Sequence, residues 1–342
     1  MKILFVGVLD ISWSTNRAMQ RELEKLGHEV ISFNYRTIES GHVSKRWYSD
    51  TKIDIWLDKA ASYLRRDSWI PFRLGWYFHR KGRDKMNHLL IETVRKGNFD
   101  LIFMSKADSV DYRLIEKISQ HAPTWYFFMD PMDQVVRMNA GAYAKRATWT
   151  SATFSDVTEY FRKTGAQAFW IPQGVNTELF TSESVEKSWD VVFVGSRTPD
   201  RTAYIKFLHR SGINVVCYGE GWENEPIFHE QLVDVYRKSR IVLNFRRSGT
   251  GFSIRVFQVL GTGTFLLSEY CPDLETFFER GAHLDWFRDK KEMLDKIRRY
   301  LADEEEREHI ARAGCRFVHD KHSWHCVMRR IVNIMNEQRE RR

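Results

Sequence analysis

The first residues of the chain alternate between short apolar runs and amphipathic segments. Residues 2–9, KILFVGVL, form an apolar run of the kind found in fully buried parallel strands. Residues 14–27 carry apolar positions at helical spacing, begin with Ser and Thr as candidate caps and end at a glycine, which predicts an α-helix. Residues 28–36, HEVISFNYR, read as a second strand. This stretch therefore predicts a βαβ unit with a right-handed crossover.

The same alternation continues along the chain in two series. In the first series, apolar runs at 99–105 and 124–130 predict further strands, each followed by a helical pattern. A second series begins with WDVVFVGSRT at 189–198 and continues with runs at 213–221 and 241–247. Two series of this kind predict an α/β fold with two Rossmann-like, doubly wound domains facing a cleft.

The break between the series falls where Pro172 and Gly174 interrupt the pattern. A length of 342 residues also exceeds what one core usually supports. We expect a first domain at 1–170, a second at 171–322, and a separate terminal helix at 323–342.

A basic and aromatic insertion interrupts the first series at about 40–97. Its aromatic residues, which stand among many Lys and Arg residues, include Trp47, Trp56, Trp69, Trp76 and Tyr77. We expect mostly helix with a loop around Pro71. Such a mixture suits an anionic membrane surface, sugar stacking or single-stranded nucleic acid. The alternative is an ordinary helical face whose Trp side chains belong to the core.

Composition narrows the partners and the compartment. The chain has 53 Lys and Arg residues and 45 Asp and Glu residues, which gives a net charge of +8. This charge favours nucleotides, nucleic acid or acidic lipid as binding partners. Alternatively, the charge only reflects a solvated basic surface. The four cysteines form no Cys-x-x-Cys pair, which favours reduced thiols. The N-terminal run has no signal-peptide pattern, and no apolar stretch approaches the roughly 20 residues of a membrane span. We expect a cytoplasmic protein, peripheral on the inner membrane face if the insertion binds lipid.

Two loops after predicted strands suit a phosphorylated ligand, because ligands of open α/β sheets bind at the carboxyl ends of strands. GSRTPDR at 195–201 supplies a glycine turn and two arginines, whose planar donors match phosphate. RRSGTGFS at 246–253 supplies two glycines before a predicted helix, whose N-terminus favours anions. Alternatively, the glycines only make turns and the arginines face solvent. Neither loop contains Gly-x-Gly-x-x-Gly or a Walker motif, which argues against an NAD enzyme.

Three segments resemble GT-B glycosyltransferases. IPQGVNTELF at 171–180 resembles their interdomain segment, DVVFVGS at 190–196 resembles the first strand of their donor domain, and 235–278 resembles their nucleotide-sugar site. Within it, RVFQVLGTGTFLLSEYCPDL is similar to the CgeB-type, or spore-maturation-type, branch of the family-4-like enzymes.

The resemblance implies a metal-independent, retaining glycosyltransferase that moves a sugar from a UDP- or GDP-sugar to an acceptor hydroxyl. The acceptor would be a glycan or a lipid-linked precursor in cell-surface glycan synthesis. The helix at 323–342 would cross back to the first domain.

The sequence departs from this family at two acids. Family-4 enzymes usually carry two glutamates eight positions apart, and the matching positions here are Thr250 and Gln258. Gln258 can hydrogen-bond a ribose but cannot form the charge-assisted bond of a carboxylate. We expect a working site, because the surrounding arginines and glycines persist. The alternatives are a non-catalytic nucleotide- or glycan-binding protein of this fold and a glycosyltransferase that modifies nucleic acid.

FMDPMDQ, at a strand end of the first domain, supplies the predicted catalytic groups. Asp130 or Asp133 would orient or deprotonate the acceptor hydroxyl. Lys106, at the neighbouring strand end, would stabilise charge. Alternatively, Asp130 only caps the following turn. The residues predicted to bind the nucleotide sugar are Gly195, Ser196, Arg197, Arg201, Tyr218, Gly219, Thr250, Gly251, Phe252, Ser253, Ile254, Arg255, Gln258 and Glu269.

Overall fold

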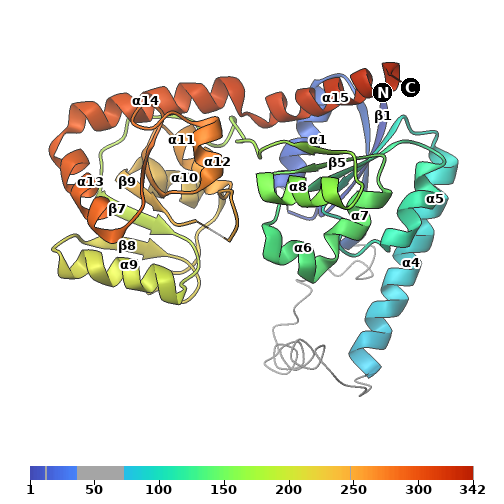
Figure 1. Ribbon diagram of the computed structural model, residues 1–342, viewed down its shortest axis with the longest axis horizontal. Helices are drawn as coiled ribbons and strands as arrows, with labels where there is room; N and C mark the ends of the chain where they lie inside the picture. Colours follow the sequence, from blue (N-terminus) through green and yellow to red (C-terminus); the bar gives the residue numbers. More distant parts are fainter. Residues whose placement is uncertain (12–13, 37–72, 247, 342) are drawn as a thin grey trace.

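The computed structural model describes residues 1–11, 14–36, 73–246 and 248–341 (Figure 1). Residues 37–72, with Trp47, Trp56 and Trp69, lie outside the described residues, so the predictions made for this part of the insertion are not addressed by the structure. The described chain forms two parallel sheets flanked by helices, which confirms the predicted α/β fold with two Rossmann-like domains.

The first domain is built on a six-stranded sheet in the order β2-β1-β3-β4-β5-β6. All pairs in it are parallel, and its strands are β1 (Lys2–Gly7), β2 (Glu29–Asn34), β3 (Leu101–Ser105), β4 (Thr124–Phe128), β5 (Trp149–Ala152) and β6 (Ala168–Trp170). The strands β3, β4 and β5 are buried throughout because helices cover both faces of a parallel sheet. The order reverses between β1 and β3, which makes their carboxyl ends the switch point where ligands bind in such sheets.

The helices of the first domain connect these strands. They are α1 (Thr15–Lys25), α4 (Arg73–Gly97), α5 (Ile115–Ser119), α6 (Met132–Met138), α7 (Ala140–Arg146) and α8 (Ser155–Lys163). Near its C-terminal end α4 packs Met86, Leu90 and Val94 against the core of the sheet, whereas its first turns extend beyond the body of the domain (Figure 1). None of the described helices is both long enough and apolar enough to cross a membrane.

The second domain is built on a five-stranded parallel sheet in the order β11-β10-β9-β7-β8. Its strands are β7 (Trp189–Val194), β8 (Val215–Tyr218), β9 (Ser239–Asn244), β10 (Phe265–Glu269) and β11 (Asp285–Phe287). Its helices are α9 (Pro199–Arg210), α10 (His229–Arg237), α11 (Arg255–Gly261), α12 (Pro272–Phe277), α13 (Lys290–Ala302) and α14 (Glu304–Lys321). The order reverses between β7 and β9, so the loops after these two strands lie at the switch point.

The last helix, α15 (Trp324–Glu340), returns to the first domain. It follows α14 along one side of the molecule and ends beside the first sheet (Figure 1). Trp324, Met328 and Ile331 are buried in the same apolar cluster as residues of β1 and α1. A parallel bridge between Val175 and Ser323 holds the two interdomain connections together.

Candidate functional site

Two arginines of the second domain meet at the ring of Phe193, near the end of β7. The guanidinium carbons of Arg201 and Arg255 each lie 5.4 Å from the centroid of this ring. Each contact is a cation–π interaction, and the ring faces are the attractive positions for a cation. Two positive charges are thus held near one ring, and an anion that reached both guanidinium groups would be stabilised.

Arg255 is held in place by buried polar groups. Its Nη1 donates to Oδ1 of Asn244 at 2.8 Å, and Asn244 closes β9 with no exposed surface. Asn244 is itself oriented, because its Nδ2 donates to Ser268 Oγ at 2.9 Å and its Oδ1 accepts from Ser253 Oγ at 3.3 Å. Burial raises the pKa of Tyr236 to about 12, and the positive charge of Arg255 partly offsets this rise. The guanidinium therefore needs little reorganisation to meet a ligand.

Asn244 was not among the predicted site residues. A signal for it exists in the sequence, because a single Asn ends the otherwise apolar run IVLNF. Buried polar side chains are retained where they have hydrogen-bond partners, and here the partners are site residues.

The loop after β7 approaches these arginines closely. A Cβ atom at Gly195 would lie 2.7 Å from Nη2 of Arg255, so a glycine is needed for the guanidinium to reach the backbone here. The amide of Gly195 donates to the carbonyl of Tyr218 at 2.8 Å, which brings the ends of β7 and β8, including Gly219, together. Arg201 Nη1 donates to the carbonyl of Ser196 at 2.7 Å. The predicted loops after β7 and β8 and the predicted Arg255 thus form one group.

Arg197 takes a different direction. Its Nη1 donates to the carbonyl of Gly221 at 3.3 Å, and its guanidinium carbon lies 5.5 Å from the ring centroid of Trp222. Of the three predicted arginines, only Arg201 and Arg255 contact Phe193.

The loop before α11 lies against the first domain. A Cβ atom at Gly251 would lie 2.4 Å from the ring of Phe154, and Ile254 packs against the core of the first sheet. Thr250 is hydrogen-bonded to the start of α8, and Phe252 is buried in the second core. The helix predicted after residues 246–253 begins at Arg255 and has seven residues, so its dipole is small. The predicted loop residues therefore make the domain interface.

Gln258 and Glu269 lie in different surroundings. Gln258 is half-buried in α11, and within the described parts of the chain its side chain has no hydrogen-bond partner. Glu269 ends β10 and accepts from the Arg246 amide at 3.1 Å and from the Tyr204 hydroxyl at 3.5 Å. Burial raises the pKa of Glu269. Both residues can accept hydrogen bonds from sugar hydroxyl groups.

In the first domain, Lys106 and Asp130 form an ion pair at the carboxyl ends of β3 and β4. Lys106 Nζ lies 2.7 Å from Asp130 Oδ2, with the Asp130 side chain 18% exposed. The backbone of Lys106 has φ +63° and that of Ala107 φ +52°, and the Ala107 amide donates to the Ser105 carbonyl at 2.7 Å. This is a γ-turn with positive φ at its centre, a rare and strained conformation that costs about 1–3 kcal/mol, and such strain clusters at functional sites.

The two predicted aspartates of FMDPMDQ have different partners. Asp130 contacts Lys106, whereas Asp133 Oδ1 accepts from Ser248 Oγ of the second domain at 2.6 Å. The N-cap of α6 is Pro131 rather than Asp130. Asp130 is thus paired with Lys106, which follows β3 at the switch point, whereas Asp133 contacts the second domain.

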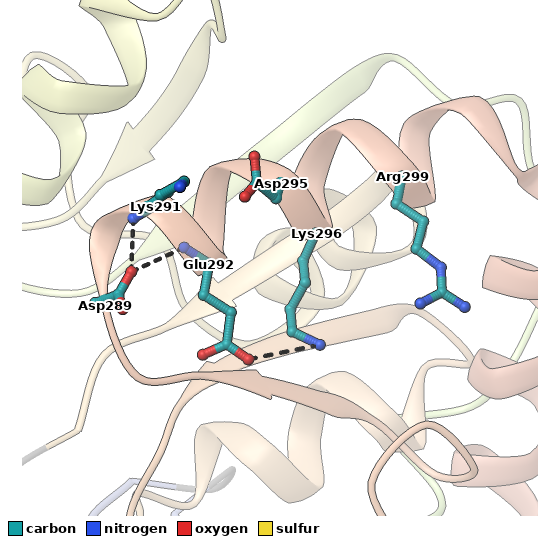
Figure 2. A pocket seen from close by; sticks show the side chains of 6 residues that line it. All are labelled: Asp289, Lys291, Glu292, Asp295, Lys296 and Arg299. Carbon is teal, nitrogen blue, oxygen red and sulfur yellow. Dashed lines mark hydrogen bonds and ion pairs between the residues drawn. The ribbon is translucent and has the colours of Figure 1, made fainter.

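A separate hollow of about 360 Å³ lies on α13 (Figure 2), and it is lined by Asp289, Lys291, Glu292, Asp295, Lys296 and Arg299. Lys296 pairs with Asp285 and Arg299 pairs with Glu306, so its charges are largely neutralised. It lies on the side of the second domain away from the first sheet (Figure 1), and we assign no site to it. Over the described ranges, no group of three or more His, Cys, Asp and Glu side chains is arranged to hold a metal ion.

A family model described as glycosyl transferase-like matches residues 198–333. No curated protein sequence matches the chain significantly. Among solved structures, HepE of Anabaena in complex with UDP and glucose aligns with 98% of this chain and 100% of its own, with a TM-score of 0.65 and 12% identity. Sucrose-phosphate synthase from Thermosynechococcus elongatus aligns over 100% of both chains, with a TM-score of 0.66 and 13% identity. A glycosyltransferase from Rickettsia africae aligns over 98% of both, with a TM-score of 0.61 and 12% identity.

These comparisons confirm the GT-B fold and support the predicted glycosyltransferase. The assignment to the spore-maturation-type branch stays a prediction.

Proposed function

We propose that the protein is a glycosyltransferase that binds the diphosphate of a nucleotide sugar between the loop at 195–201 and Arg255. The observation that carries this proposal is the convergence of Arg201 and Arg255 on Phe193. Asn244 orients Arg255 by a hydrogen bond of 2.8 Å before any ligand arrives. A diphosphate would accept charge-assisted hydrogen bonds from both guanidinium groups, and such bonds are about twice as strong as neutral ones.

The same arginines would serve the chemical step. When the glycosidic bond to the nucleotide breaks, negative charge grows on the leaving diphosphate. Preorganised cationic donors stabilise such charge more in the transition state than in the ground state, which lowers the barrier. We therefore propose that the reaction needs no metal ion.

For the donor we propose a UDP-sugar. HepE, which shares the fold, was solved with UDP, with UDP and glucose, and with UDP-glucose. The half-buried amide of Gln258 would bind the ribose, and Glu269 would accept from a hydroxyl group of the donor. Residues 171–322 would form the donor domain.

For the acceptor we propose a hydroxyl group at the Lys106–Asp130 pair. The Asp130 carboxylate would orient this hydroxyl or accept its proton, and Lys106 would stabilise the resulting charge. The strained turn at Lys106 supports a role beyond packing. A retaining outcome, a glycan or lipid-linked acceptor from cell-surface synthesis, and membrane contact through 40–97 rest on the sequence resemblance and remain part of the proposal.

The decisive experiment is calorimetric titration with UDP, GDP, ADP, CMP and dTDP, followed by incubation of the preferred nucleotide's sugars with acceptor mixtures. Selective binding of one nucleoside diphosphate, together with release of that diphosphate from its sugar in the presence of an acceptor, supports a transferase. Selective binding without turnover in any mixture would favour a non-catalytic protein of this fold. Binding of nucleic acid that weakens steeply with salt, with no nucleotide bound, would favour the nucleic-acid alternative.

A further inference from the structure

The N-terminus of α8 in the first domain has no capping side chain of its own. Its N-cap residue is Phe154, which offers no hydrogen-bond acceptor beyond the backbone. The first amides of a helix have no partner within the helix, and a buried helix start needs acceptors from elsewhere. The Val157 amide donates to Asp156 within α8 at 2.8 Å, but the acceptors for the two amides before it come from the second domain.

Asp273, in the first turn of α12, supplies the main acceptor. The residue is 2% exposed, and its carboxylate accepts from the Ser155 amide at 3.0 Å and from Ser155 Oγ at 2.5 Å. Ser155 and Asp273 are 118 residues apart and belong to different domains. Asp273 thus caps the N-terminus of α8 from another domain, whereas an N-cap aspartate usually belongs to the same segment as its helix.

Thr250 joins the same cluster from the loop before α11. Its Oγ1 donates to Asp273 Oδ2 at 3.2 Å, lies 2.8 Å from Ser155 Oγ, and accepts from the Asp156 amide at 3.3 Å. The amide of Asp273 in turn donates to the Thr250 carbonyl at 3.0 Å. One buried group of side chains therefore ties together α8, α12 and the loop.

This loop leads directly into the proposed donor site. Three residues after Thr250 comes Ser253, which bonds to Asn244, and two residues later comes Arg255. Separation of the domains would remove both Ser155 donors from Asp273 and the Asp156 donor from Thr250. The loop would then lose the contacts that fix its position.

We propose that Asp273, Thr250 and Ser155 form an interdomain latch, in which domain closure positions the loop that carries the donor-binding residues. Asp273 and Thr250 are positioning residues, because they act through the loop and not on the substrate. The link to donor binding rests on the proposed function, whereas the latch itself does not.

Amide hydrogen exchange of the full chain tests the latch directly. Asp273→Asn replaces one of the two accepting oxygens, and Ser155→Ala removes the Oγ donor that holds this carboxylate. In both variants the first-turn amides of α8 should exchange several-fold faster, up to about the tenfold expected for a lost N-cap. Because both changes weaken the same contact between Ser155 and Asp273, while the amide of residue 155 can still donate in Ser155→Ala, the effects of the two changes should be less than additive in the double variant. Asp289→Asn is the matched control: Asp289 caps α13 within the second domain, so this change should affect α13 alone.

Nucleotide binding tests the consequence. Thr250→Val should raise the apparent Kd for UDP and the KM for the donor about threefold to tenfold, with a smaller change in kcat, because fewer molecules hold the competent loop position. Thr250→Ser keeps the hydroxyl group and should restore both values.

The proposal is overturned if α8 exchange is unchanged in both Asp273→Asn and Ser155→Ala, or if Thr250→Ser binds UDP as weakly as Thr250→Val. Ser155→Ala keeps the test available if Asp273→Asn fails to fold. If the unaltered protein binds no nucleotide, the proposed function fails, and the exchange rates still decide the latch.

Discussion

Replacing Arg255 with alanine tests the donor site most directly. The Arg255 guanidinium is bonded to Asn244 at 2.8 Å and is half-buried, so its hydrogen bonds to a ligand would be only partly screened by water. Hydrogen bonds to charged groups contribute about 1.5–3 kcal/mol. At about 1.4 kcal/mol for each tenfold change, the affinity for UDP should fall roughly 10-fold to 150-fold.

The measurement is calorimetric titration of UDP and of uridine into the unaltered protein and the Arg255→Ala variant. Uridine lacks phosphate, so its affinity should change little. Arg240→Ala is a matched control, since it removes the same charge from the start of β9, where Arg240 pairs with Asp190 at 2.6 Å. An exposed charge at that end of the strand is screened by salt and should matter little. Equal losses in Arg255→Ala and Arg240→Ala, or an equal loss for uridine, would refute a phosphate contact by Arg255.

Three further changes address other parts of the structure. Asp130→Asn should lower kcat by about 10²- to 10⁴-fold and leave the Kd of UDP nearly unchanged, and unaltered turnover would remove Asp130 from the mechanism. Gln258→Glu should bind UDP more tightly than the unaltered protein, by about fivefold, and should gain less for 2′-deoxy-UDP in the same titration, because a charge-assisted bond to the ribose replaces a neutral one. Burial lowers the pKa of His322 from 6.5 to about 4, so the unfolded chain binds a proton that the folded protein does not bind between these values. The free energy of unfolding should therefore fall by up to about 3 kcal/mol as the pH drops from 7 to 4.5, and His322→Phe should lose less in parallel urea titrations.

The fold was predictable because its strands are continuous apolar runs. Residues 3–6 of KILFVG and 191–194 of WDVVFV are buried, as parallel strands between helices must be, and the glycine that ends or follows each run marks the carboxyl end of the strand. Strand ends in turn indicate where ligands bind. The position of the loop at 195–201 in the structure follows from this regularity alone.

The directions of the arginine side chains were not predictable. Arg197 and Arg201 stand four positions apart, in the loop after β7 and in the first turn of α9, yet Arg197 contacts Trp222 and Arg201 contacts Phe193. The difference depends on rings and carbonyl groups supplied by β7 and by the loop after β8, and nothing in the local sequence around either arginine reports it. Long flexible side chains choose among such partners only when the tertiary structure is complete.

The contacts between domains were also invisible in the sequence. Pro272 and Asp273 read as an ordinary helix start, with Pro at the first position and an acid in the first turn. Ser155 likewise reads as a helix start. That the acid of one helix caps the other depends on how the two domains dock, and a separation of 118 residues hides it.

This docking also explains why position 250 holds no acid. Thr250 Oγ1 lies 3.2 Å from Asp273 Oδ2 in a buried cluster. A glutamate at 250 would add a second carboxylate close to this buried cluster, and a like charge nearby disfavours the ionisation of both groups. Burial already raises the pKa of Asp273 although three groups donate to it, so a further negative charge would be costly. A hydroxyl group, which can donate to Asp273 and accept from Asp156, fits both demands. The threonine at position 250 and the aspartate at 273 are therefore physically linked, and the missing acid does not by itself argue for a dead donor site.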